Sequence, residues 1–98
     1  MNKKRLAIRF RYKCPVSYTV LGIEPTQPPE KVAVQAETVD LSNGGMRIKG
    51  ERAPKEGVLI KVQIPVSEHD VMVPVLTEVR WVKEERPGEY QAGLRFLM

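Results

Sequence analysis

Several residue types are scarce in this chain of 98 residues, and each scarcity excludes a class of protein. A lone cysteine, Cys14, cannot form a disulfide within the chain, which suits a reducing compartment. No apolar run approaches the roughly 18 residues that a membrane helix needs. The N-terminus lacks the apolar core of a signal peptide. We therefore expect a single cytoplasmic domain with no transmembrane segment.

Residues for catalysis or metal binding are also few. His69 is the one histidine, and Glu68 and Asp70 flank it directly. Adjacent loop or strand residues point apart, so this triplet lacks the spacing of a metal site. Cys14 and His69 could pair as nucleophile and base, but no third orienting group accompanies them, and a packed, inert thiol is expected. The phosphate-binding patterns GxxxxGK and GxGxxG are absent. We expect no enzyme, no metal and no cofactor.

Acidic residues are missing from the first thirteen positions, which carry six lysines and arginines. Residues 14–98 hold the other ten basic residues and all twelve acidic ones, so the body has a net charge of about −2. A protein that coats nucleic acid more often spreads positive charge over one face of its body. The asymmetry favours a compact anionic partner bound by a basic arm, and makes nucleic acid a less favoured partner.

The rest of the chain has the pattern of short strands separated by turns, and no stretch of ten residues has helical periodicity. Met46 and Ile48 alternate with Arg47 and Lys49, which is typical of a half-buried strand. Pro74 within the longest apolar run indicates a bulge or an edge position. The predicted strands span 15–20, 32–40, 46–49, 58–64, 71–82 and 90–97. Their spacing predicts an all-β barrel or sandwich over residues 14–98, preceded by an arm over residues 1–13.

The segment TVDLSNGGMRIK combines polar side chains with glycines at a strand end. Asp40 and Ser42 are two residues apart, so their side chains emerge on the same face. An ionised carboxylate suits the N–H edge of guanine, and a hydroxyl can donate to a phosphate or a carbonyl. Gly44 and Gly45 permit positive φ in a turn or close approach to a ligand, and Arg47 adds a cation. An Asx- or Ser-turn that only caps a hairpin explains the same residues.

Two arginines of the arm, Arg5 and Arg9, stand four residues apart. The guanidinium fork matches both the O6/N7 edge of guanine and phosphate oxygens. The two would be about 13 Å apart on an extended segment and neighbours on a helical turn. Either spacing could bracket a small ligand with guanines and phosphates. A solvated tail without a ligand remains the alternative.

Together, Arg5-Leu-Ala-Ile-Arg9 and Asp40-Leu-Ser42-Asn-Gly-Gly45 resemble the RxxxR and [D/N]xSxxG signature of the PilZ domain. The segment FRYKCPVSY after Arg9 and the segments VRWV and GLRFL also look like those of the family, so the resemblance spans nearly the whole chain. It implies a small six-stranded antiparallel β-barrel of the split-barrel type that binds cyclic di-GMP on its surface.

By this resemblance, Arg5 and Arg9 would grip guanine edges and phosphates, while Asp40 and Ser42 would read a guanine. Gly45 would permit the turn and the close approach. Lys4, just before the first arginine, would influence whether one ligand or a stacked pair binds, and a long cationic side chain favours the pair. We expect the arm to be mobile until ligand orders it, because it has little apolar surface to bury.

The resemblance implies a regulatory function. The domain would act on an effector protein that controls motility, exopolysaccharide production or adhesion. Two alternatives stay open. A small barrel could bind single-stranded nucleic acid, but this needs aromatic platforms, and the six aromatic residues are dispersed along the chain. Trp81 among them is expected to pack in the core or at the barrel rim. A PilZ-like adaptor that acts without nucleotide is the other, and the intact signature residues argue against it.

Overall fold

The architecture is all-β. The computed structural model describes residues 10–11, 13–22, 33–66 and 71–97, and these contain seven strands and no helix. The strands are β1 (Phe10–Arg11), β2 (Pro15–Gly22), β3 (Val34–Leu41), β4 (Gly45–Gly50), β5 (Leu59–Val66), β6 (Val71–Arg86) and β7 (Glu89–Phe96).

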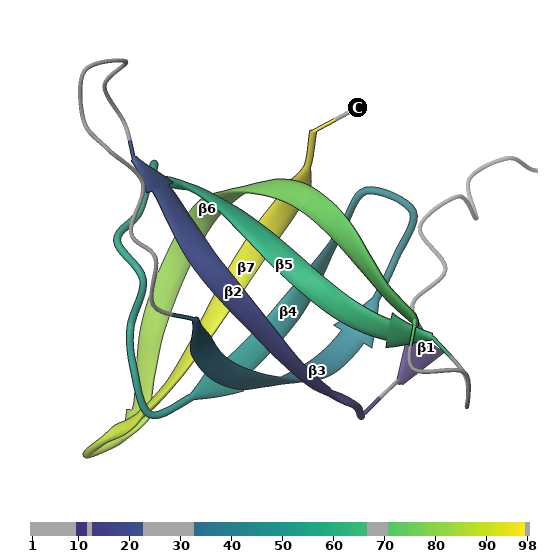
Figure 1. The fold of residues 1–98 in the computed structure, drawn as a ribbon. Coiled ribbons are helices and arrows are strands. Elements are labelled where there is room, and N and C mark those ends of the chain that lie inside the picture. The colour runs from purple at the N-terminus through teal and green to yellow at the C-terminus, as the bar shows by residue number, and fades with distance from the viewer. Residues whose placement is uncertain (1–9, 12, 23–32, 67–70, 98) are drawn as a thin grey trace, which may run out of the picture.

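Six of the strands close into a barrel. Every pairing is antiparallel, in the order β3-β2-β5-β6-β7-β4, and a further pairing between β3 and β4 closes the ring (Figure 1). Closure leaves most strand edges paired, which removes the exposed edges that an open sheet would have. The six-stranded antiparallel barrel expected from the sequence is therefore confirmed.

Alternation along the strands fills the barrel with apolar side chains. On β5 and the residue before it, Val58, Ile60 and Val62 are buried, while Lys61 between them is half-exposed. Burial at every second residue is what a pleated strand with one solvated face requires. The core consists of Cys14, Val16, Tyr18, Met46, Ile48, Val58, Ile60, Val62, Val79, Ala92 and Leu94.

Cys14 belongs to this core. Its thiol is buried and donates a hydrogen bond to the carbonyl oxygen of Pro15 at 3.4 Å. The sequence-based expectation of a packed thiol is confirmed. His69, its suggested catalytic partner, lies outside the described residues.

The strands β2, β4, β5 and β6 are longer than the sequence indicates, and one short strand, β1, was not predicted. β6 extends to Arg86, four residues past the predicted end at Val82. Phe10 and Arg11 form β1, although both fall inside the segment predicted as an arm. Two residues are too few for a periodic pattern, so alternation could not have revealed this strand.

Pro74 occupies an edge position, one of the two that its sequence context allowed. β6 pairs with β5 from Val71 onward, but its pairing with β7 starts only at Thr77. The amide of Leu97 donates to the carbonyl oxygen of Leu76, so the peptide groups of Leu76 face β7. Two residues earlier, Pro74 faces the same side by alternation. Its missing N–H therefore lies on an edge of β6 that no described strand pairs with at this point.

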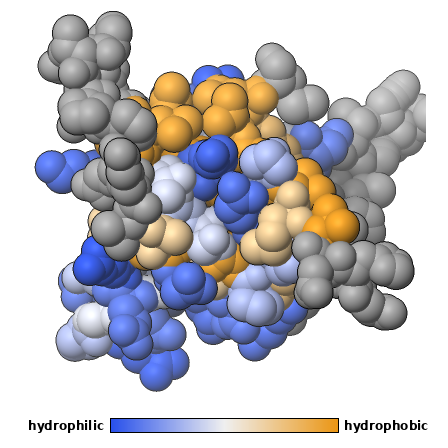
Figure 2. Space-filling view, viewed as in Figure 1, coloured by the Kyte–Doolittle hydropathy of each residue, from blue (hydrophilic) through white to orange (hydrophobic). Residues whose placement is uncertain are grey.

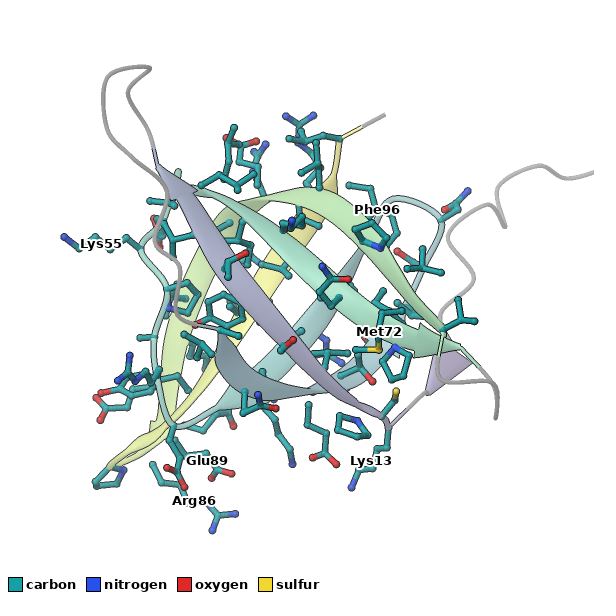
Figure 3. All side chains as sticks on the ribbon, in the orientation of Figure 1. Lys13, Lys55, Met72, Arg86, Glu89 and Phe96 are labelled. Atoms are coloured by element: carbon teal, nitrogen blue, oxygen red, sulfur yellow. The ribbon has the colours of Figure 1, made fainter. Side chains whose placement is uncertain are left out.

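Apolar side chains also remain on the surface of this part of β6. Val71, Met72, Val73 and Leu76 are between 41% and 50% exposed. On the face shown in Figure 2, hydrophilic residues cover the centre and lower part, while apolar ones gather along the top and at the right. Met72 lies toward the right-hand end of the barrel with Lys13, and Arg86 and Glu89 lie at the opposite end (Figure 3).

Candidate functional site

The short strand β1 brings the start of the chain to the strand that carries Asp40. Arg11 pairs with Asp40 and Phe10 with Leu41, at the end of β3 where β4 turns away (Figure 1). β3 is therefore flanked by β1 on one side and by β4 on the other. Arg9, the second arginine of the signature, directly precedes β1 in the sequence. Lys4, Arg5 and Arg9 themselves lie outside the described residues.

A β-bulge at Val39 decides which way Asp40 points. Thr38 pairs with the buried Ile48, and Asp40 pairs with Arg47, which leaves Val39 as an extra residue between the two pairs. Without the bulge, alternation would put Asp40 on the interior face with Thr38. The bulge instead places it on the outer face, beside Arg47. Regular alternation could not have predicted this change of face.

Asp40 and Arg47 form a fork-like ion pair across β3 and β4. The Nε of Arg47 lies 3.1 Å from each carboxylate oxygen of Asp40, and its Nη2 donates to Oδ2. The Asp40 side chain is only 6% exposed and that of Arg47 is 37% exposed. A charge so deeply buried needs a partner with good geometry, because its desolvation is costly. The guanidinium fork provides such a partner.

The electrostatics of this pair favour a permanently charged Arg47. Its hydrogen bond to Asp40 raises the pKa of the Arg47 guanidinium above the usual value. Desolvation acts in the opposite direction, and the negative charges of Asp40 and Glu85 add to the rise. Arg47 thus stays cationic at every pH at which the protein is folded. The sequence placed this cation near the site but did not predict its pairing with Asp40.

Ser42 lies in the turn that joins β3 to β4. Its amide donates to the carbonyl oxygen of Gly45 at 2.9 Å, and the amide of Gly44 donates to Ser42 Oγ at 3.4 Å. The hydroxyl also lies 3.4 Å from the carbonyl oxygen of Gly45. Ser42 therefore serves the turn, as one of the two sequence-based interpretations held. Both hydrogen bonds of the Ser42 hydroxyl are long, so they hold it only weakly.

Gly44 and Gly45 do not have the backbone conformation expected of them. In the described chain, the glycines with positive φ are Gly57 and Gly88, so the expected use of positive φ in the SNGG turn is wrong. Gly45 is needed for a different reason. A Cβ at this position would lie 2.0 Å from the carbonyl oxygen of Leu94, so β4 starts too close to β7 for any side chain. No atom lies within 4 Å of the corresponding point at Gly44.

A groove runs over the outer face from this turn toward β6. Arg47, Gly93 and Trp81 face one another across β4, β7 and β6. A Cβ on Gly93 would lie 2.1 Å from Nε1 of Trp81, so the indole rests against the glycine backbone. Trp81 is 37% exposed, which shows that it packs on the outer surface and not in the core. The groove encloses about 200 Å³ and is lined by Ser42, Gly44, Gly45, Met46, Arg47, Arg80, Trp81, Gly93, Leu94 and Arg95.

Two further arginines of this groove, Arg80 and Arg95, were not predicted from the sequence. Arg95 donates to Glu78 at 2.8 Å, and Arg80 lies 3.7 Å from the same carboxylate oxygen. A second bulge between Val79 and Trp81 makes Arg80 the extra residue of β6. The signal that could have been read is the VRW segment, in which a buried valine is followed by two residues that both face outward. With Arg47, the groove has three cations and one aromatic ring.

A second hollow lies on the other side of Arg47. It measures about 410 Å³ and is lined by Lys13, Val39, Asp40 and Arg47. Arg47 therefore separates two adjacent hollows that both contain cations. A larger groove, of about 660 Å³, lies along the start of β3 and the end of β4, but Glu37, Glu51 and Glu89 outnumber Lys49 and Arg52 there. That balance does not favour an anion.

Other kinds of site find little support in the part of the chain that the structure describes. Its histidine, cysteine and acidic side chains form no group of three or more that could hold a metal ion. The same residues contain no helix that could span a membrane. The residues that line the two hollows beside Arg47 include cations, a carboxylate, a hydroxyl and an indole, which are groups that can bind anions and nucleobases.

Comparison with known proteins identifies the family. A search of curated proteins finds no match to the chain. A family model described as the PilZ domain matches residues 3–98, which includes both signature motifs and all seven strands. The barrel is the fold that the sequence resemblance implied. The chain belongs to the PilZ domain family, whose members are receptors for cyclic di-GMP.

Proposed function

We propose that this chain is a cytoplasmic receptor for cyclic di-GMP that regulates an effector protein. The observation that carries the proposal is the pairing of β1 with β3, Arg11 opposite Asp40. This pairing puts the two residues that follow Arg9 beside the end of β3, which holds Asp40 and leads into the turn that holds Ser42. Had the chain entered the barrel on the far side, the two halves of the signature could not serve one ligand.

In this proposal, each half of the site recognises a different part of the dinucleotide. Asp40 accepts hydrogen bonds from one guanine, and Ser42, Gly44 and Gly45 present polar and backbone groups at the turn. Arg5 and Arg9 bind guanine edges or phosphates, and Lys4 influences whether one ligand or two are held. Arg47 adds positive charge between the two hollows.

The regulatory step is the ordering of the arm. Fixing a backbone residue costs about 1–2 kcal/mol, so several charge-assisted contacts to the two phosphates are needed to offset it. The ordered arm changes the surface at its end of the barrel, and an effector protein distinguishes the two states. A polymer synthase, a flagellar or pilus component, or a fused domain could be that effector. The domain itself performs no catalysis and needs no cofactor.

Calorimetric titration with cyclic di-GMP tests the proposal directly. Binding should weaken as salt rises, because the contacts to phosphate are screened. Arg9→Ala should lower the affinity at least about tenfold, through loss of a charge-assisted contact. Arg86→Ala is the matched control, since Arg86 pairs with Glu89 at 3.2 Å at the opposite end of the barrel (Figure 3). It should bind like the wild type. Retained affinity in Arg9→Ala would refute the role of Arg9.

The two alternatives give different results in the same experiments. Single-stranded nucleic acid needs a row of exposed aromatic rings. Here Tyr18 is buried in the core, while Trp81 stands against Gly93 on the outer face. A gel shift with an oligonucleotide that cyclic di-GMP does not compete would favour a nucleic-acid barrel. An adaptor that acts without nucleotide would give no heat of binding when it is titrated with cyclic di-GMP.

A further inference from the structure

We propose that Arg47 is a positioning residue that gives Asp40 its preference for guanine. The inference rests on the proposed function and assigns to Arg47 a role different from a simple cation. In this role Arg47 acts through Asp40, by fixing the plane and the charge of the carboxylate that meets the base. It does not depend on a direct bond between Arg47 and the ligand.

The first support is the geometry of the pair. The Nε of Arg47 lies at the same distance, 3.1 Å, from both carboxylate oxygens, and Nη2 donates to one of them. Two nitrogens of a rigid planar group thus hold one carboxylate, which restrains its rotation about χ2.

The second support is that Arg47 is itself held in place. It lies on β4 between Met46 and Ile48, both of which are buried in the core. Its backbone pairs with Asp40 on one side and with Gly93 on the other. The bulge at Val39 brings Asp40 onto the same outer face. Both partners are therefore positioned by the barrel, before any ligand arrives.

The third support is what guanine requires. Its Watson–Crick edge presents N1–H and the N2 amino group as neighbouring donors. An ionised carboxylate that lies in the plane of the base can accept both of them, one on each oxygen. The Asp40 side chain is 6% exposed, so a lone charge there would be strongly disfavoured. Arg47 supplies the compensating charge and the correct plane.

A lysine at position 47 would keep the charge but not the fork. Its ammonium group is a point charge on a flexible stem, and it cannot bind both oxygens in one plane. Arg47→Lys should therefore leave the barrel folded and the local charge unchanged, while the carboxylate becomes free to turn. This single variant therefore separates the effect of the charge at position 47 from the effect of the orientation of the Asp40 carboxylate.

The experiment compares cyclic di-GMP with cyclic di-IMP, which keeps N1–H but lacks the 2-amino group. The wild type should prefer cyclic di-GMP about tenfold, the value of one hydrogen bond to a charged acceptor. In Arg47→Lys this ratio should fall toward one, mainly because affinity for cyclic di-GMP is lost. Lys49→Gln is the matched control: Lys49 lies on the same face of β4 and within 4.0 Å of Glu37, away from Asp40. It should keep the tenfold preference.

The outcomes separate this inference from the proposed function. If the wild type binds cyclic di-GMP and Arg47→Lys keeps the tenfold preference, Arg47 does not position Asp40 and the inference is wrong. Equal weakening for both ligands in Arg47→Lys would assign it a direct contact with phosphate instead, and would also overturn the inference. If the wild type binds neither ligand, the proposed function fails, and the inference falls with it.

A spectroscopic measurement gives an independent answer. In an NMR spectrum of the free protein, the Nε–H proton of Arg47 should be protected from exchange with water and shifted from its usual position. Both properties should persist when cyclic di-GMP is bound. Loss of this signal on saturation would mean that Arg47 leaves Asp40 to contact the ligand. That result would contradict a positioning role even if the affinity ratios agreed with it.

Discussion

At the scale of single residues, Gly44 and Gly45 show how little a sequence motif reveals about the reason for a residue. Both stand in the same turn, and the sequence predicts the same use for both. Only Gly45 has a backbone carbonyl where a side chain would begin. The constraint comes from Leu94 on β7, about fifty positions later in the chain, so no local pattern could have indicated it.

Gly45→Ala should destabilise the barrel. The added methyl group would collide with the carbonyl oxygen of Leu94, which belongs to a paired strand and cannot move aside freely. The expected loss is about 1–3 kcal/mol in the free energy of unfolding. Chemical denaturation followed by tryptophan fluorescence would measure it, since Trp81 lies on the neighbouring strand β6.

Gly44→Ala is the matched control for this prediction. It makes the same chemical change one residue earlier, where the structure has open space and no positive φ. We expect no loss of stability, and a gain of up to about 1 kcal/mol from a less flexible unfolded chain. Equal destabilisation by both substitutions would contradict the assignment of the constraint to Leu94.

At the scale of the strands, alternation predicted the barrel well and its irregularities poorly. Val58, Ile60 and Val62 point inward, as expected from a period of two residues. The bulges at Val39 and Arg80 interrupt that period, and both lie at the candidate site. A bulge depends on which strand lies opposite, so a single sequence does not reveal it. The motif therefore predicts a role for Asp40 and Ser42, but it does not reveal the ion pair or the groove beside them.

The unpaired edge of β6 gives a prediction for this element. Pro74→Ala would add an N–H group to an edge whose side chains, such as Met72 and Leu76, are already apolar and exposed. An edge with more donors is a better template for pairing with another chain. The variant should therefore self-associate at concentrations where the wild type does not, as measured by light scattering.

Met72→Ala is the control, because it also shortens an exposed side chain of β6 but leaves the backbone donors unchanged. It should associate no more than the wild type. If both variants, or neither, became more associated, the missing N–H of Pro74 would not be what protects this edge.

At the scale of the whole molecule, the charge of the arm and the packing of the barrel are separate properties. The core residues run from Cys14 to Leu94, and the body that contains them carries a net charge of about −2. The arm carries six basic residues, and the core residues of the described chain all follow it in the sequence. Truncation of the arm should therefore affect ligand binding without affecting the stability of the barrel.

Removal of residues 1–9 should abolish the binding of cyclic di-GMP and leave the barrel folded. β1 would be kept, since it starts at Phe10, and every core residue of the described chain would remain. The melting temperature should change by no more than a few degrees, whereas calorimetry should detect no binding. A truncated chain that binds as tightly as the full one would show that Arg5 and Arg9 are not part of the site.

The pairing of β1 with β3 also affects how the receptor works at low abundance. Arg9 directly precedes β1, whose Phe10 pairs with Leu41, the residue after Asp40. On so short a tether, its effective concentration at the site is on the order of millimolar or higher, whatever the number of molecules in the cell. In the proposed function, Arg9 would then capture the second half of the ligand in an intramolecular step, and dilution of the protein should not weaken that step.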